Sequence, residues 1–332
     1  MNWVALGAIA QLAGAVGSIA IAIIAVYVGV RQWVDGKRIS REQRELTQEI
    51  DRNNEASKLE QERIIRAQSL DSYFDGISTL LLRDEDGVFT DTARALTKGR
   101  TDSILKILKA DEKRNLLAFL YGSGLISQNG DSEPPMLALS GSDLSNVELN
   151  GVSMQHAGFG LANLRGAEIK EAELDGVDLR GADLSDADLT GSDLSQGNLH
   201  GLIAAHANMN QVDLSDSDLS GANLRGADLS GSDLSSTNLS GANLDGANLR
   251  DSRLENANLS GANLRGTNLT GAVLESAQLS HLISIEGSDF TSATGLSDES
   301  VEYLASIAKG SHPETYRQTA RTLNDLAATD KP

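Results

Sequence analysis

The chain has 332 residues, of which 47 are acidic and 28 are basic, so its formal net charge is −19. It contains no cysteine, which excludes disulfides, thiolate metal sites, iron–sulfur clusters and a cysteine nucleophile. Aromatic residues make up only 4% of the chain, fewer than an enzyme core of this size ordinarily uses. The acidic balance argues against direct nucleic-acid binding, because such binding needs clustered Lys and Arg.

The first predicted element is a transmembrane helix over residues 4–30. This run has 27 positions without a charged side chain, and about 20 helical residues suffice to cross a bilayer. A cleaved signal peptide fits less well, because no basic segment precedes the run and the run is too long. We therefore expect a single-pass protein of the plasma (inner) membrane. The positive-inside rule places its C-terminal bulk in the cytoplasm, because basic residues follow the run closely: Arg31, Lys37, Arg38, Arg41 and Arg44.

Residues 31–68 are predicted to form a polar helical stalk, since they hold 9 basic and 8 acidic residues and no proline. Apolar residues recur at a spacing of three and four, but polar residues interrupt this seam. A coiled coil and a solvated charged helix both remain open. The apolar positions are Ile39, Leu46, Ile50 and Ile64, and the interruptions are Asn53, Ser57 and Glu60.

Residues 69–126 are predicted to form a small helical cap region. One apolar stripe runs from Leu70 to Leu81, and further helices are expected at 91–110 and 111–121. Asp111 is the predicted N-cap of the last helix, which Gly122 ends. A linker over residues 127–136 follows, in which two adjacent prolines prevent any helix.

A period of five residues dominates the segment 137–290. Stepping by five from Leu139 to Leu279 gives 29 positions, of which 24 are Leu, and Ala204 is the only one that is not large and apolar. A small residue mostly stands two positions earlier, Asp or Asn mostly stands between them, and Gly occupies 15 of the 29 positions two residues later. A period of five fits neither a strand nor an α-helix. It predicts a solenoid with flat sides, whose large and small residues face the axis and whose glycines occupy corners with positive φ.

This segment resembles the pentapeptide-repeat family, whose pattern A(D/N)LXX is matched in full by Ala222-Asn223-Leu224-Arg225-Gly226. The resemblance implies a mainly β chain with a right-handed quadrilateral β-helix of four pentapeptides per coil. The preceding segment, with Phe119-Leu120-Tyr121 and Gly124-Leu125-Ile126, is similar to that of membrane-anchored bacterial members. Residues 291–332 are predicted to close the β-helix with two helices, the first capped by Ser297 and the second opened by Pro313. They either cap the coil end or form a dimer contact.

Acidic residues are concentrated in the β-helical segment, which holds 22 acidic and 7 basic residues. Residues 20 apart are expected to stack, so four acids should form one ladder: Glu173, Asp193, Asp213 and Asp233. A solvated face is one explanation of this ladder, and a cation or a basic partner surface is the other.

Two isoleucines occupy positions where Asp or Asn is expected. Ala204 and Ser284 stand at five-residue positions that are otherwise large, and Leu202 and Leu282 stand at the small positions before them. The exchange would leave Ile203 and Ile283 on the outside as an apolar docking spot. A local bulge that turns each isoleucine inward is the alternative.

No catalytic, cofactor or metal site is expected, because the histidines lack metal-ligand spacing and no carboxylate pair stands out. We expect a non-enzymatic, membrane-tethered scaffold that presents an acidic β-helical rod to an unidentified protein partner in the cytoplasm. Homo-oligomers could form through the transmembrane, stalk or C-terminal helices. The alternative is an acidic DNA mimic that modulates a type II topoisomerase (gyrase), as the family resemblance implies for some members.

Overall fold

The computed structural model describes residues 3–81, 91–127 and 137–308, and for residues 3–29, 39, 42, 80 and 81 it describes the backbone only. The chain forms two compact units, Met1–Gln68 and Ser69–Pro332. The predicted linker lies almost wholly outside the described residues, as does the predicted helix that begins at Pro313.

Helix α1 runs without a break from Trp3 to Leu81. The side chains of nearly the whole predicted transmembrane run lie outside the described ones. Among the described residues, no helix is both long and apolar enough to cross a membrane. In the stalk, Leu46 and Ile50 are about half exposed, at 59% and 50%, and local ion pairs such as Arg63 with Glu60 line the helix.

Three helical segments contribute the first part of the hydrophobic core of the second unit, which continues into the β-helix. They are the last turns of α1, α2 (Asp91–Leu105) and α3 (Ala110–Gly122). The Tyr73 hydroxyl lies 2.9 Å from the Thr101 hydroxyl, and the Phe74 and Phe119 rings meet edge to face. Helix α2 is shorter than predicted. The prediction of Asp111 as N-cap is wrong, because α3 begins one residue earlier and the N–H of Lys109 donates to the Glu112 carboxylate at 2.9 Å.

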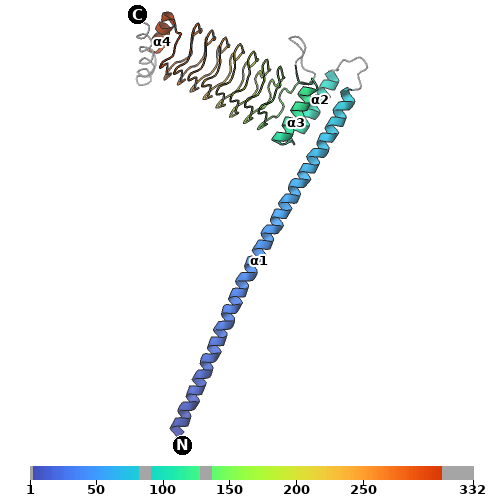
Figure 1. Ribbon diagram of the computed structural model, residues 1–332, viewed down its shortest axis with the longest axis vertical. Coiled ribbons are helices and arrows are strands. Elements are labelled where there is room, and N and C mark those ends of the chain that lie inside the picture. The colour runs from blue at the N-terminus through green and yellow to red at the C-terminus, as the bar shows by residue number, and fades with distance from the viewer. Residues whose placement is uncertain (1–2, 82–90, 128–136, 309–332) are drawn as a thin grey trace. The chain divides into compact units, whose positions relative to one another are not determined.

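Residues 137–294 form a β-helix with four sides, which confirms the solenoid predicted from the five-residue period. Single-residue parallel bridges link positions 20 apart in four columns, from Asp143 with Asn163 to Asn258 with Gln278. The coils follow one another as a stack (Figure 1). Each coil therefore consists of four pentapeptides, and its backbone bonds join it to the coils above and below.

The large and small columns both face the axis, as predicted. Every large position from Leu139 to Leu279 is at most 5% exposed, and serines in the small column donate their hydroxyls to nearby carbonyls at 2.6–2.7 Å. Leu202 and Ala204 are both fully buried. The predicted exchange of large and small side chains therefore occurs in this coil, where it leaves the packed volume nearly unchanged.

The corner of each pentapeptide lies two residues after its large apolar residue, and all 29 of these corner residues, from Gly141 to His281, have φ between +52° and +72°. Glycine adopts this left-handed conformation without strain, which explains its frequency there. Leu161 is the least expected occupant of such a corner, with φ of 59° and 63% of its surface exposed.

The Asp or Asn before each large residue holds the turn that follows it. Its side-chain oxygen accepts a hydrogen bond from the N–H two residues on, for example from Ser215 to Asp213 at 2.9 Å and from Arg225 to Asn223 at 3.3 Å. Asp and Asn both supply an Oδ1 atom that can accept this bond, so either residue type can occupy the position. These side chains are therefore structural as well as solvated.

The last coil contains a β-bulge at Ile283, which was the predicted alternative to an exchange of large and small side chains. The N–H of Ile283 donates to the carbonyl of Ala262, while the carbonyl of Ser284 accepts the N–H of Leu264. Two residues, Ile283 and Ser284, therefore lie opposite the single residue Asn263. The prediction that Ser284 occupies a large position is therefore wrong. Ile285 occupies it instead and is 2% exposed, while Leu282 fills the small position and Ile283 is turned outward.

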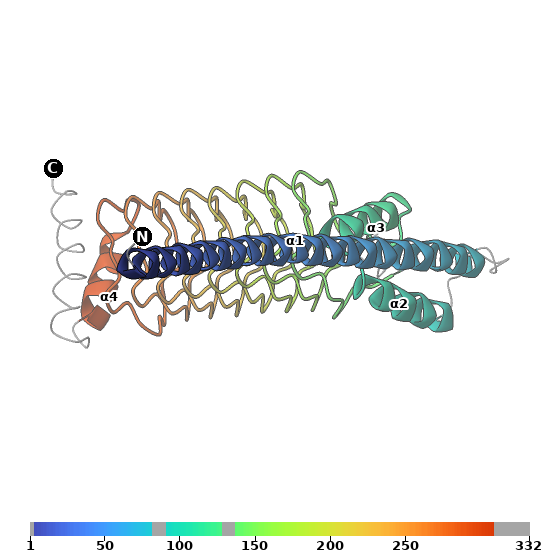
Figure 2. The ribbon, with the colours of Figure 1, turned by 90° about the horizontal axis from the view of Figure 1, so that it is seen from below.

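The two ends of the β-helix are covered by helices (Figures 1 and 2). At the first coil, Lys113 and Tyr121 of α3 contact Ser145 and Gln155, and Gly158 donates its N–H to Ile126 at 2.9 Å. At the other end, α4 (Asp298–Ala308) buries Leu304 and Ala308 against the last coil, and the Ser297 hydroxyl accepts the N–H of Ser300 at 3.2 Å.

We predict that Gly221→Ala lowers the free energy of unfolding by about 1 kcal/mol. A Cβ at Gly221 would meet no atom within 4 Å, so the backbone at φ +67° is the only source of strain. Leu161→Gly should raise the free energy of unfolding for the same reason. Urea unfolding followed by circular dichroism measures both variants, and an unchanged stability of Gly221→Ala would contradict the assignment.

Candidate interaction surface

The four bridge columns give the β-helix four outer faces, and the four predicted acids lie on one of them. Glu173, Asp193, Asp213 and Asp233 are consecutive in this column, which we call the acidic ladder. Successive members lie about 4.8 Å apart by the spacing of neighbouring strands. Ser153 precedes the ladder in the column, and Arg253 follows it.

One carboxylate oxygen of each aspartate in the acidic ladder is used within its own coil. The Oδ1 atoms of Asp193, Asp213 and Asp233 accept the N–H two residues on at 2.9–3.0 Å. Arg253 binds the other oxygen of Asp233 at 3.0 Å. No hydrogen bond reaches the Oδ2 atoms of Asp193 and Asp213 from any described residue, so these oxygens are the available part of the ladder.

Elsewhere on the β-helix the positive charges are taken up by ion pairs. At one corner, Arg225, Asp245, Arg265 and Glu286 alternate in sign from coil to coil, with N···O distances of 3.4–3.7 Å. Arg165, Lys170, Arg180 and Arg250 also pair with aspartates. Because acids outnumber bases threefold in this segment, the pairs leave the first three members of the ladder without a Lys or Arg partner among the described residues. The alternating corner was not predicted from the sequence, because its residues follow the large position of the repeat, whereas the predicted ladder used only the position before it.

Ile203 and Ile283 lie on the face opposite the acidic ladder. Ile203 is 39% exposed in a regular coil, and Ile283 is 72% exposed at the bulge. Neither side chain is turned inward. The alternative prediction of a bulge is therefore wrong for Ile203, whose coil is regular, whereas at Ile283 the bulge is present but the side chain points outward. The two are four coils apart, about 19 Å, and three asparagines lie between them, joined by side-chain amide bonds of 3.1–3.3 Å: Asn223, Asn243 and Asn263. The structure therefore does not bring the isoleucines together into one apolar patch.

Hydrogen bonds to the turns also affect the acidity of carboxylates outside the ladder. The Ser145 hydroxyl is the main reason that the pKa of Asp143 lies below its usual value, since its effect outweighs that of partial burial. At Asp183, partial burial would raise the pKa, but bonds from Ser185 and the charge of Arg165 together lower it. Asp143 and Asp183 therefore stay negatively charged down to a lower pH than an ordinary aspartate does. No group of His and acidic residues among the described ones is placed to hold a metal ion.

Comparisons with known proteins identify the five-residue repeat. The family model described as Pentapeptide repeats matches in eight copies, over residues 159–196, 182–221, 198–231, 213–251 and 252–294. None of the curated proteins compared with the chain matches it.

Several solved structures also match the chain. QnrB1, a plasmid-mediated fluoroquinolone resistance protein, is 22% identical over 47% of this chain and 75% of its own, with a TM-score of 0.37. A pentapeptide repeat protein of the Arabidopsis thaliana thylakoid lumen is 32% identical over 44% of this chain and 89% of its own, with a TM-score of 0.33. HetL of Nostoc sp. strain PCC 7120, a pentapeptide repeat protein involved in heterocyst differentiation regulation, is 24% identical over 56% of this chain and 96% of its own, with a TM-score of 0.21.

We predict that Asp213→Asn raises the free energy of unfolding by about 0.5 kcal/mol at low salt, because it removes repulsion from two stacked carboxylates while an amide keeps the turn bond. The gain should vanish near 1 M salt, where such repulsion is screened. Asp228→Asn is the matched control, since its neighbours in the adjacent column are Asn208 and Asn248. Equal effects of the two variants in urea unfolding would show that ladder repulsion is negligible.

Proposed function

We infer the function of this chain from its membership of the pentapeptide-repeat family, to which the repeats over residues 159–294 assign it. We propose that it is a non-enzymatic scaffold, tethered to the membrane, which presents the acidic ladder to a basic surface of a protein partner in the cytoplasm.

The observation that supports this proposal is the uneven distribution of unpaired charge. The basic residues of the β-helix are engaged in ion pairs, whereas Asp193 and Asp213 each keep one carboxylate oxygen without a hydrogen bond from a described residue. Stacked like charges cost stability unless a cation or a basic surface offsets them. A flat, rigid face with regularly spaced carboxylates suits lysine and arginine side chains of a partner, which reach such oxygens with charge-assisted hydrogen bonds.

The proposal of a scaffold rather than an enzyme rests on how the polar side chains are used. The Asp and Asn side chains hold turns, and the buried hydroxyls bind carbonyls of the coil. Groups committed to the backbone in this way are poor candidates for proton transfer, which needs a group free to exchange protons with a substrate.

Membrane tethering is proposed from the sequence. The uncharged run over residues 4–30 is long enough to span a bilayer, and the basic residues that follow it favour a cytoplasmic location for the β-helix.

Mimicry of DNA, with gyrase as the target, is the less well supported alternative. A duplex mimic needs negative charge that continues along the rod, but the column of the ladder changes sign at Arg253 and becomes apolar at Val273. The acidic ladder itself spans only three coil spacings, about 14 Å.

We predict that replacing Asp193, Asp213 and Asp233 by Asn abolishes capture of a specific partner by residues 69–332, the second compact unit. The amides preserve the turn bonds, so the fold is retained while three charges are lost. Affinity capture from lysate at low salt, followed by quantification of each captured protein, measures the change.

The matched control replaces Asp188, Asp228 and Asp289 by Asn on the adjacent face, which changes the net charge equally. A partner retained by the control and lost by the ladder variant supports the proposal. A partner that both variants retain, or no specific partner for the unaltered unit, contradicts it.

We predict that the full chain stays with the membrane pellet after an alkaline carbonate wash, whereas a chain that begins at Ser69 remains in the supernatant. Carbonate strips proteins held by surface charge but leaves membrane-spanning helices in place. Release of the full chain by carbonate would contradict the proposed tether without affecting the proposal for the ladder.

A further inference from the structure

Each face of an interior coil makes three backbone hydrogen bonds to the next coil. On the face that ends at Gln278, Leu259 and Gly261 donate their N–H groups to the carbonyls of Gln278 and Ser280, both at 2.8 Å. Gln278 in turn donates its N–H to Ala257 at 2.9 Å. The same three bonds recur in the coils below, so they define what one more strand on this face would have to supply.

The last coil offers these three groups again, without a partner among the described residues. They are the N–H groups of Leu279 and His281 and the carbonyl of Ala277, which correspond by position to those of Leu259, Gly261 and Ala257. An unpaired strand edge of this kind is a template for another extended chain.

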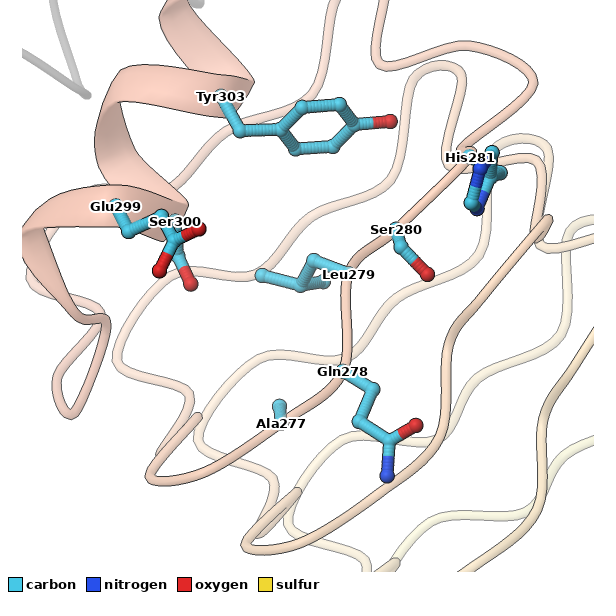
Figure 3. Close-up of a pocket in the computed structure, with 8 residues that line it drawn as sticks. All are labelled: Ala277, Gln278, Leu279, Ser280, His281, Glu299, Ser300 and Tyr303. Atoms are coloured by element: carbon cyan, nitrogen blue, oxygen red, sulfur yellow. The ribbon is translucent and has the colours of Figure 1, made fainter.

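Helix α4 covers the coil end but leaves this edge open. The Tyr303 hydroxyl accepts the N–H of Leu282 at 3.0 Å, which fixes the helix at a distance from the strand. Between them lies a pocket of about 470 Å³, bounded on the strand side by Ala277–His281 and on the helix side by Glu299, Ser300 and Tyr303. Figure 3 shows the Leu279 side chain directed toward Glu299 and Ser300 across this space.

We propose that this edge binds an extended segment of a partner protein as one further parallel strand. The residue of the segment that lies opposite Gln278 donates its N–H to the carbonyl of Ala277, and its own carbonyl accepts the N–H of Leu279. The carbonyl of the residue two positions later in the segment accepts the N–H of His281. The binding is a case of β-strand addition, in which main-chain bonds supply the affinity and alternate side chains supply the specificity.

The pocket also limits which side chains the segment carries. Alternate residues of a strand point to the same side, so the residues before and after the central one point toward Ala277 and Leu279. A small residue suits the first position and an aliphatic residue the second, in keeping with the columns of the β-helix. Glu299 is exposed at the wall of the pocket and the β-helical segment is strongly acidic, so a segment with flanking lysines is favoured. This site is separate from the acidic ladder, and its occupation does not depend on the function proposed for the ladder.

The test uses the full chain and the probe peptide acetyl-Lys-Ala-Asn-Leu-Ser-Lys-amide. Hydrogen–deuterium exchange, resolved to single residues, should show fast exchange at the Leu279 and His281 amides in the free chain. Saturating probe should slow both amides, while the amides of Leu259 and Gly261, one coil earlier, stay slow throughout. A probe N-methylated at its Asn lacks the donor for Ala277 and should bind at least about tenfold more weakly.

Glu299→Lys should weaken binding of the probe about threefold, and Glu302→Lys, an exposed acid on the same helix, should leave it unchanged. Slow exchange at Leu279 and His281 in the free chain would overturn the proposal, because the edge would then be occupied by this chain or by a second copy. Unchanged exchange with the probe, or equal binding of the N-methylated probe, would overturn it as well.

Discussion

The step of 20 residues between bonded positions is the constraint on which the rest of this structure depends. Because the parallel bridges between regular coils join residues 20 apart, side chains at the same position of the repeat stack directly above one another. Leu stacks on Leu along the axis, Asn on Asn along one face, and carboxylate on carboxylate along another. A local sequence choice therefore becomes a property of an entire face, and charge on the surface is organised into columns.

The same constraint explains why the β-helix could be predicted from the sequence. A five-residue period leaves no other regular backbone available, and the positive φ at every corner agrees with the glycines at about half of these positions. The positions of Glu173, Asp193, Asp213 and Asp233 in one column followed from counting by 20, which needs no knowledge of side-chain contacts.

Counting failed where the chain departs from the period. A single extra residue at Ile283 moves every later position by one, and nothing in the residues 282–285 distinguishes a bulge from a second exchange of large and small side chains. The ion pairs of Arg225, Asp245 and Arg265 were missed because their geometry depends on long side chains at the corners. The start of α3 at Ala110 was missed because Lys109 uses its backbone N–H, which the sequence does not reveal.

The bond from each Asp or Asn to its own turn has a consequence for how such a surface diversifies. Exchange of one residue type for the other alters formal charge but preserves the oxygen that the backbone needs, as Asp213 and Asn223 illustrate. A single mutation can therefore change the surface charge of one coil while the turn bond is kept, so the charge pattern can vary without loss of the fold. Rods built from the same repeat can consequently present different charges to their partners, and the repeat by itself is weak guidance to what any one rod binds.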